Sequence, residues 1–190
     1  MDFKSAAELL KLCEEENLPI SQVMRHREMS ETGADRTDID HRMARAWEIM
    51  TESAKTPLTT PGKSMGGLIG GEAKKLADHQ AAGKGLCGDV LGAAMTYAMA
   101  VLEVNSSMGL IVAAPTAGSA GVVPGLLLAL QEAYQKTDED VISALFNAGA
   151  VGYLAMRNAT VAGAVGGCQA EVGVAAAMAA SAAVELMGGS

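Results

Sequence analysis

The 190-residue chain has a formal net charge of −8, with 14 Lys and Arg against 22 Asp and Glu. This balance disfavours nucleic acid or an anionic membrane as partner, because phosphate binding relies on clustered cations. Apolar residues make up 49% of the chain but aromatic residues only 3%, so the core must be built from small aliphatic side chains. Such side chains suit close helix packing, and the composition therefore predicts an all-α fold in a single domain, residues 1–190.

The cysteines and the first residues of the chain indicate the compartment. The chain has three cysteines, Cys13, Cys87 and Cys168. An odd number of cysteines far apart in the sequence does not suggest a disulfide framework. Met1 leads directly into a polar helical pattern rather than into a signal peptide. We therefore expect a reduced, cytoplasmic protein.

The first two helices can be read from their start and stop signals. Ser5-Ala-Ala-Glu8 has the spacing of a capping box, and apolar residues recur behind it at helical spacing to about Glu16. Cys13 falls on the apolar face of this helix. A second helix is expected from Ile20 to about Gly33.

The third helix should be capped by Thr37 and should end near Lys55, with Trp47 as a core anchor. The stretch from Thr56 to Pro61 contains two prolines and is expected to be a loop. Beyond it the composition changes from charged and amphipathic to small, apolar and rich in glycine. Residues 61–190 are therefore predicted to form a Gly- and Ala-rich helical core behind the amphipathic helices of residues 1–60.

Four further helices complete a total of about seven or eight, with Gly-rich loops between buried helices. A glycine-rich stretch, Ser64 to Gly71, should be a series of turns. The later helices are expected at Glu72–Ala82, at Val90–Glu103 with Asp89 as cap, from a Thr137 cap to about Met156, and at Gln169–Met187.

The segment from Val104 to Gln131 carries no charge and is long enough to be tested as a membrane span. Pro115, Pro124 and several glycines would break a spanning helix, and lipid does not tolerate the unpaired backbone groups at such breaks. A buried, broken helix is expected instead. We therefore expect no membrane partner.

Two polar segments inside this uncharged stretch are candidate binding elements. The loop Pro115–Gly121 has two hydroxyl groups, Thr116 and Ser119, among small residues, where backbone N–H groups could converge on an anion. The alternative is a turn that only serves packing. Asn105 and Ser106 lie just ahead of the same stretch and need polar partners if buried, although Asn105 also suits a plain helix C-cap.

Cys168 is the third candidate. It follows two glycines at the start of an expected helix, where exposed N–H groups favour a thiolate and so a metal ligand. The alternative is a small buried hydrophobe. The three histidines, His26, His41 and His79, lack zinc-ligand spacing and are expected at the surface.

Four strings, taken in order, carry a resemblance to a known family: SMGGLIGGEAKK, EVNSSMG, PTAGSAGVVP and GGCQAEVG, at residues 64–75, 103–109, 115–124 and 166–173. Together with the N-terminal helices, they resemble the alpha chain of the iron–sulfur-dependent L-serine dehydratases. The resemblance implies an all-helical alpha chain that works with a beta chain and converts L-serine to pyruvate and ammonia.

The resemblance also implies a cofactor and its ligands. In the family, three cysteines hold a 4Fe–4S cluster, and Cys168 matches the first of them. The other two belong to CDPVAG-like and EVPC-like strings that these 190 residues do not contain. We therefore expect that this sequence lacks the C-terminal cluster-binding part, and that it holds no intact cluster and shows no activity by itself.

Burial of polar groups in an uncharged segment suggests roles for these residues in binding the substrate that the resemblance implies. The substrate serine is expected to be cradled by Asn105, Ser106, Thr116, Gly118, Ser119 and Gly121. Lys75 is a candidate for electrostatic or base duty. Two alternatives from other classes remain: a non-catalytic helical assembly or regulatory module, and, less favoured, a small membrane fragment. Apolar surface left uncovered could also make the chain a homo-oligomer.

Overall fold

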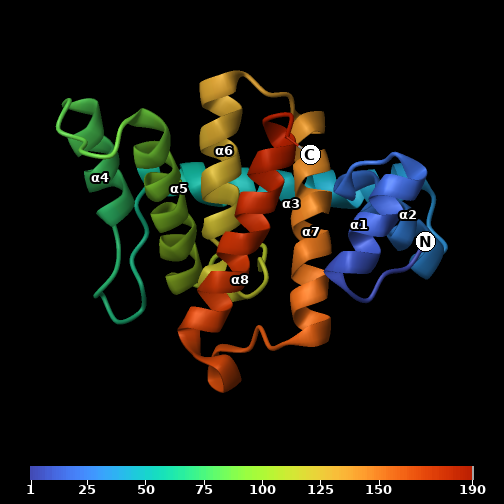
Figure 1. Ribbon diagram of the computed structural model, residues 1–190. Coiled ribbons are helices and arrows are strands. Elements are labelled where there is room, and N and C mark those ends of the chain that lie inside the picture. Colours follow the sequence, from blue (N-terminus) through green and yellow to red (C-terminus); the bar gives the residue numbers. More distant parts are fainter. Residues whose placement is uncertain (190) are drawn as a thin grey trace. The chain divides into compact units, whose positions relative to one another are not determined.

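The computed structural model describes residues 1–189, and every regular element in them is helical (Figure 1). Eight α-helices and one 3-10 turn confirm the predicted all-α class and the predicted number of helices. The chain divides into two compact units, Met1–Arg45 with Thr137–Ser190 and Ala46–Lys136. The long helix α3 (Arg36–Thr59) passes from the first unit into the second.

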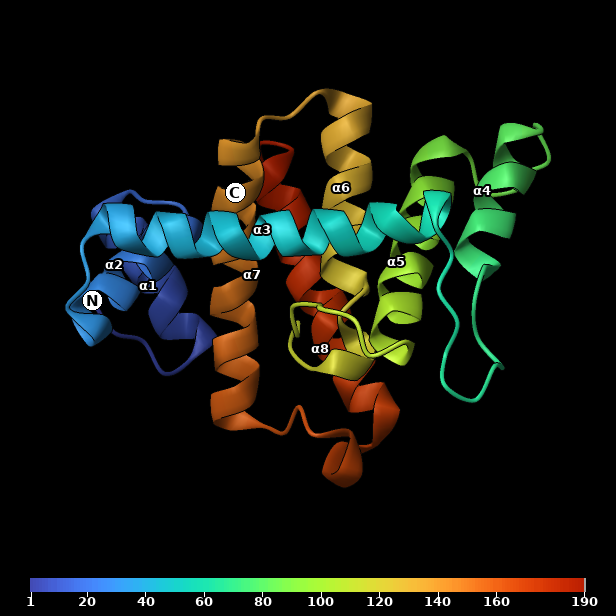
Figure 2. The ribbon, with the colours of Figure 1, turned by 180° about the vertical axis from the view of Figure 1, so that it is seen from behind.

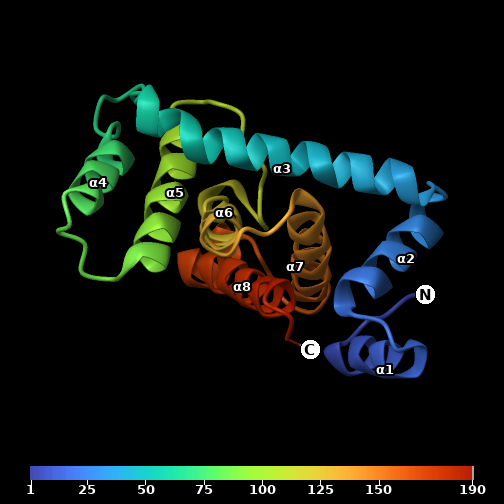
Figure 3. The same ribbon diagram turned by 90° about the horizontal axis from the view of Figure 1, so that it is seen from above.

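The first unit combines the two ends of the chain. It contains the start of α3 and four complete helices: α1 (Ala6–Glu16), α2 (Ile20–Thr32), α7 (Asp138–Asn158) and α8 (Gly163–Leu186). Helix α7 packs against both α2 and α8, as Figure 3 shows from above. Cys13 packs on the core of this unit from the apolar face of α1, as predicted. That core consists of Phe3, Leu9, Val23, Met24, Ile39, Phe146 and Ala150.

Side-chain hydrogen bonds from nearby residues cap the N-termini of three helices in this unit. The Ser5 hydroxyl accepts the Glu8 N–H at 3.2 Å, and Thr137 forms a full capping box with Asp140, so both predicted caps are confirmed. The predicted Thr37 cap is wrong. Asp35 caps α3 instead, accepting the Asp38 N–H at 2.9 Å, because an Asp two residues earlier is at least as good an N-cap.

Buried polar groups fix α8 against α7. Asn147 is 1% exposed, and its side-chain N–H donates to Glu185 at 2.7 Å while its oxygen accepts the Ser181 hydroxyl at 2.6 Å. A buried amide without partners would be costly, so this arrangement selects one register of the two helices.

Helix α8 is the one helix among residues 1–189 that is long and apolar enough to cross a membrane by length and composition. Only 22% of this apolar stretch is buried, and α8 packs on α7 through the buried Met178 and through the bond from Asn147 to Glu185. Gly167 has non-helical angles, φ 75° and ψ 166°, which kink the helix. Beyond the kink, the regular helix begins at Cys168.

The second unit contains the end of α3 and three further helices: α4 (Glu72–Ala81), α5 (Asp89–Ser106) and α6 (Val122–Tyr134). Helix α5 contacts both α4 and α6, and a 3-10 turn, η1 (Ala117–Ser119), precedes α6. Figure 2 shows the two long connections of this unit, from α3 to α4 and from α5 to α6.

Three predictions in this unit are wrong. Helix α3 runs to Thr59, through the predicted loop at Thr56–Pro61, because Pro57 is fully buried and its packing offsets one lost backbone hydrogen bond. Gly88, not Asp89, is the N-cap of α5. The uncharged stretch from Val104 is not one broken helix, because the chain leaves helical geometry after Ser106 and regains it only at α6.

Candidate functional site

Three segments of the second unit meet at the end of α5. They are the α3–α4 loop (residues 60–71), the α5 end (residues 103–109) and the Thr116 loop (residues 115–121). Hydrogen bonds from Glu103 and Asn105 join the α5 end to the other two segments. The predicted substrate residues lie in two of these three segments.

The two hydroxyl residues of the Thr116 loop differ in burial. Ser119 is 1% exposed, and its Oγ donates to the Ala114 carbonyl at 3.3 Å and lies 3.2 Å from Thr116 Oγ1. Thr116 is half-buried and Gly118 is exposed, and the peptide bond before Pro115 is cis. Ser119 therefore closes the loop from within, while Gly118 lies at the surface.

Gly121 ends this loop and is buried by close packing. A Cβ atom there would lie 2.3 Å from the carbonyl oxygen of Ala98 on α5, so only glycine fits. Helix α6 begins at the next residue, and its N-cap, Gly121, has no side chain to cap it. The positive end of the helix dipole therefore lies next to the loop.

At the α5 end, Asn105 connects helix and loop. Its side-chain N–H donates to the Ala117 carbonyl at 3.0 Å, which leaves its amide oxygen free to accept a hydrogen bond from another group. Asn105 lies inside the last turn of α5, with Ser107 at the C-cap, so the plain-cap interpretation of Asn105 does not hold. The Ser106 hydroxyl donates to its own helix, to the Glu103 carbonyl at 2.9 Å.

Glu103 is a site residue that the sequence analysis missed. It is 3% exposed, and its two oxygens accept the N–H groups of Gly71, at 3.0 Å, and Ala73, at 2.7 Å. One signal could have found it, because Glu103 is the only charged residue between Val90 and Gln131. A lone charge in an apolar stretch must find partners on burial.

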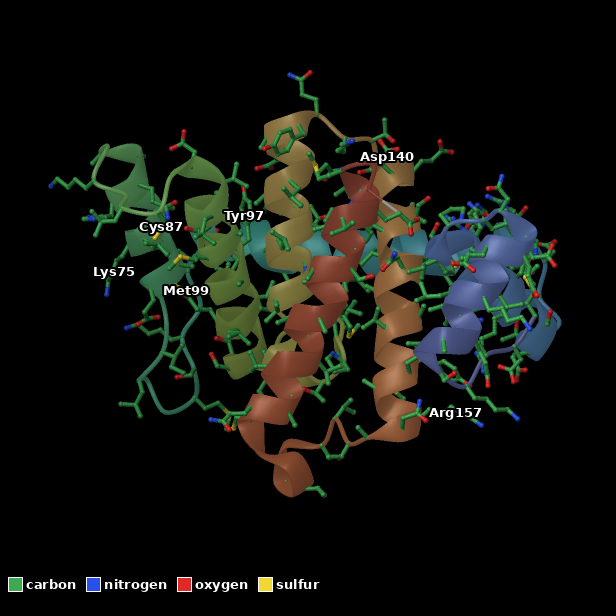
Figure 4. All side chains as sticks on the ribbon, viewed as in Figure 1. Lys75, Cys87, Tyr97, Met99, Asp140 and Arg157 are labelled. Atoms are coloured by element: carbon green, nitrogen blue, oxygen red, sulfur yellow. The ribbon has the colours of Figure 1, made fainter. Side chains whose placement is uncertain are left out.

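Lys75 does not lie in any of the three segments that meet at the end of α5. It is exposed on α4, and in Figure 4 its side chain projects outward from that helix. Its charge acts on Glu72, whose pKa is lowered first by the hydrogen bond from the Gly70 N–H at 2.7 Å and then by its own amide and by Lys75. The structure thus places Lys75 apart from the polar groups of the α5 end and the Thr116 loop.

Cys168 belongs to the first unit and is exposed at the start of the regular part of α8, the position predicted for it. In the described part of the chain, no group of three or more His, Cys, Asp or Glu side chains could hold a metal ion. Cys13 is half-buried and Cys87 is exposed in the second unit. The residues described therefore do not form a complete cluster site, because Cys168 stands without companion ligands.

Large apolar side chains surround the polar segments of the second unit. Met65 and Leu68 in the α3–α4 loop are 91% and 89% exposed, and Met108 at the α5 end is 81% exposed. Exposed apolar residues near polar groups are typical of surfaces that another protein segment or a ligand covers.

Comparison with known proteins supports the family resemblance carried by the four sequence strings. The serine dehydratase alpha chain family matches residues 15–190. The chain is 44% identical over 187 residues to the probable L-serine dehydratase, alpha chain, of Bacillus subtilis, covering 98% of this chain and 62% of the relative. It is 37% identical over 187 residues to the L-serine dehydratase, alpha chain, of Peptoniphilus asaccharolyticus, with 98% and 64% covered.

A longer relative is L-serine dehydratase TdcG of Escherichia coli, which is 37% identical over 194 residues that cover 100% of this chain and 42% of the relative. The chain thus spans less than two thirds of the length of these relatives. The match nevertheless includes all four strings and both compact units. The chain belongs to the serine dehydratase alpha chain family.

Proposed function

We propose that this chain forms the serine-binding part of an L-serine dehydratase, which converts L-serine to pyruvate and ammonia. The observation that carries the proposal is the hydrogen bond from Asn105 to Ala117, which joins the α5 end to the Thr116 loop in a chain of this family. The groups proposed for the site are the Asn105 amide, the Thr116 hydroxyl and the N-terminus of α6, all within one compact unit.

Both charged groups of L-serine, the carboxylate and the ammonium group, have suitable partners in this unit. The carboxylate is matched by the N-terminus of α6, the Thr116 hydroxyl and the Gly118 backbone, since helix N-termini favour anions. The ammonium group is matched by oxygen acceptors, the Asn105 amide oxygen and the Ser106 hydroxyl. Buried Ser119 and Gly121 act by shaping the loop. Lys75 contributes positive charge at a distance, through Glu72.

The reaction itself is an elimination. A base removes the α-proton of serine, the β-hydroxyl leaves as water, and the resulting aminoacrylate hydrolyses to pyruvate and ammonia. Holding the carboxylate and the ammonium group fixes Cα and so the direction of its C–H bond toward a base, and this orientation lowers the entropic part of the barrier. The residues of the second unit described above supply this orientation.

We further propose that Cys168 supplies one thiolate of a 4Fe–4S cluster, whose other ligands come from outside these 190 residues. A beta chain is proposed as partner, and the cytoplasm as the location. The 190-residue chain alone is then expected to form no pyruvate.

The competing proposal is a non-catalytic assembly module. The observation in its favour is the group of exposed apolar side chains, Met65, Leu68 and Met108, which would suit docking of another chain.

One experiment separates the two. The complete alpha chain is reconstituted anaerobically with iron, sulfide and its beta chain, and pyruvate formed from L-serine is measured. Pyruvate formation supports the dehydratase. A spectroscopically intact cluster without pyruvate would reject it and favour the module.

A further inference from the structure

We infer that Glu103 is a positioning residue: it clamps the α3–α4 loop to the α5 end and so sets the shape of the proposed serine site. This inference rests on the proposed function and deepens it. It concerns a residue that neither binds serine nor belongs to the cradle itself.

The clamp is a helix cap supplied by another helix. Helix α4 begins after Gly71, which has no side chain to cap it, and the nearby Glu72 carboxylate accepts the Gly70 N–H at 2.7 Å. The first amides of α4 would lack acceptors, but Glu103 of α5 accepts two of them, Gly71 N–H at 3.0 Å and Ala73 N–H at 2.7 Å. The carboxylate is also favoured by the positive end of the α4 dipole. Burial of its charge at 3% exposure is thereby compensated.

The loop that Glu103 holds is a closed structure. Ser64 and Ile69 exchange two hydrogen bonds, from Ser64 N–H to the Ile69 carbonyl at 2.9 Å and from Ile69 N–H to Ser64 Oγ at 3.1 Å. Gly70, at φ 151°, lies so close to Gly62 that a Cβ on Gly70 would stand 2.2 Å from the Gly62 carbonyl oxygen. A loop closed in this way moves as one piece, so a tether at its end positions all of it.

The same loop touches the α5 end a second time. A Cβ on Gly62 would lie 3.1 Å from Ser107 Oγ, and that hydroxyl is buried without a hydrogen-bond partner. Ser107 is therefore in contact with the α3–α4 loop but makes no side-chain hydrogen bond to it. The directional bonds between the loop and α5 come from Glu103.

One helical turn thus holds both loops. Glu103 faces the α3–α4 loop and Asn105 faces the Thr116 loop, as expected for residues two apart, which lie on different sides of a helix. The distance between the two loops is then fixed by the backbone of α5 between these residues. Loss of the Glu103 bonds would free the α3–α4 loop from the α5 end, which carries Asn105 and Ser106, while the Thr116 loop stays tethered by Asn105.

Glu103 is not suited to be the base of the reaction. Both of its oxygens already accept amide protons, and its side chain is almost fully buried, so it cannot reach a proton of bound serine. Its expected effect is on substrate affinity rather than on proton transfer.

The test uses the complete enzyme with Glu103→Gln, which keeps the shape of the side chain but places an NH2 donor against one of the two amides. We expect the Gly71 and Ala73 amides to exchange with deuterium about tenfold faster or more, measured by hydrogen-exchange mass spectrometry. We also expect the KM for L-serine to rise by about tenfold, with cluster absorbance unchanged, because a small shift of the α5 end misplaces Asn105 and Ser106.

The matched control is Glu132→Gln. Glu132 is a carboxylate of the same unit that is bonded to Lys55 and Tyr97, away from both loops. It should leave the exchange at Gly71 and Ala73, and the KM, as in the wild type. If it raises KM as much as Glu103→Gln does, the effect is general instability and the inference is overturned.

The remaining outcomes are also decisive. Unchanged exchange at Gly71 and Ala73 would overturn the clamp. Faster exchange with unchanged KM would overturn its role in the serine site and leave the proposed function intact. Absence of pyruvate from the wild-type enzyme would instead reject the proposed function, and with it a role of Glu103 at a serine site.

Discussion

A Cβ atom on Gly125 of α6 would lie 2.7 Å from the carbonyl oxygen of Ala94 on α5. The two helices therefore approach each other closely at this glycine. We predict that Gly125→Ala lowers the free energy of unfolding by about 1–3 kcal/mol, because the added methyl group must push the helices apart. Urea denaturation followed by circular dichroism measures the change.

Gly173→Ala is the matched control. Gly173 also lies inside a helix, α8, but a Cβ there meets nothing within 4 Å. This variant should raise the free energy of unfolding by about 0.5–1 kcal/mol through helix propensity alone. Equal effects of the two substitutions would contradict the close approach of α5 and α6.

The pair Tyr97 and Glu132 predicts a pH dependence of stability. Burial, together with the hydrogen bond to Glu132 and its negative charge, raises the pKa of Tyr97 well above its usual value of 10.0. Above pH 10 the unfolded chain releases the tyrosine proton while the folded chain keeps it, so stability falls as pH rises. Tyr97→Phe removes this dependence.

The measurement is urea unfolding of both proteins at about pH 8 and about pH 11. The advantage of the wild type over Tyr97→Phe should shrink at the higher pH. Tyr134→Phe, which removes the hydroxyl of an exposed tyrosine, should leave the pH dependence in place. An advantage over Tyr97→Phe that stays constant or grows would refute the account of this pair.

The three cysteines of the 190-residue chain should differ in reactivity. Burial, and then the negative charge of Glu185, raise the pKa of the Cys13 thiol, whereas Cys87 and Cys168 are exposed. Because the thiolate is the reactive form, iodoacetamide should label Cys13 last, about tenfold more slowly, near neutral pH. Peptide mass spectrometry over time gives the three rates, and fastest labelling at Cys13 would contradict the structure.

Two of the four helix caps predicted from the sequence, Ser5 and Thr137, were correct. The caps at Ser5 and Thr137 depend on hydrogen bonds three residues away, so the pattern alone contains the information. Pro57 was misjudged because its tolerance within α3 depends on burial by distant residues. Gly167 was placed correctly ahead of the last helix, although the single helical turn before its kink was not foreseen.

The candidate site was predicted in part. The polar segments containing Asn105 and Thr116 were found because hydroxyls and amides stand out in an uncharged stretch. The bond from Asn105 to Ala117 spans 12 residues across an irregular connection, and no periodicity predicts such a contact. Glu103 was passed over as an ordinary helix end, since its two partners lie 30 and 32 residues earlier.

Thr116→Val in the complete enzyme shows whether the Thr116 loop holds L-serine, because valine keeps the shape of threonine and removes its hydroxyl. We predict that the KM for L-serine rises about tenfold or more in a pyruvate assay, with the cluster spectrum unchanged, and that Thr116→Ser restores most of the affinity. A KM for Thr116→Val equal to that of the wild type would contradict the account.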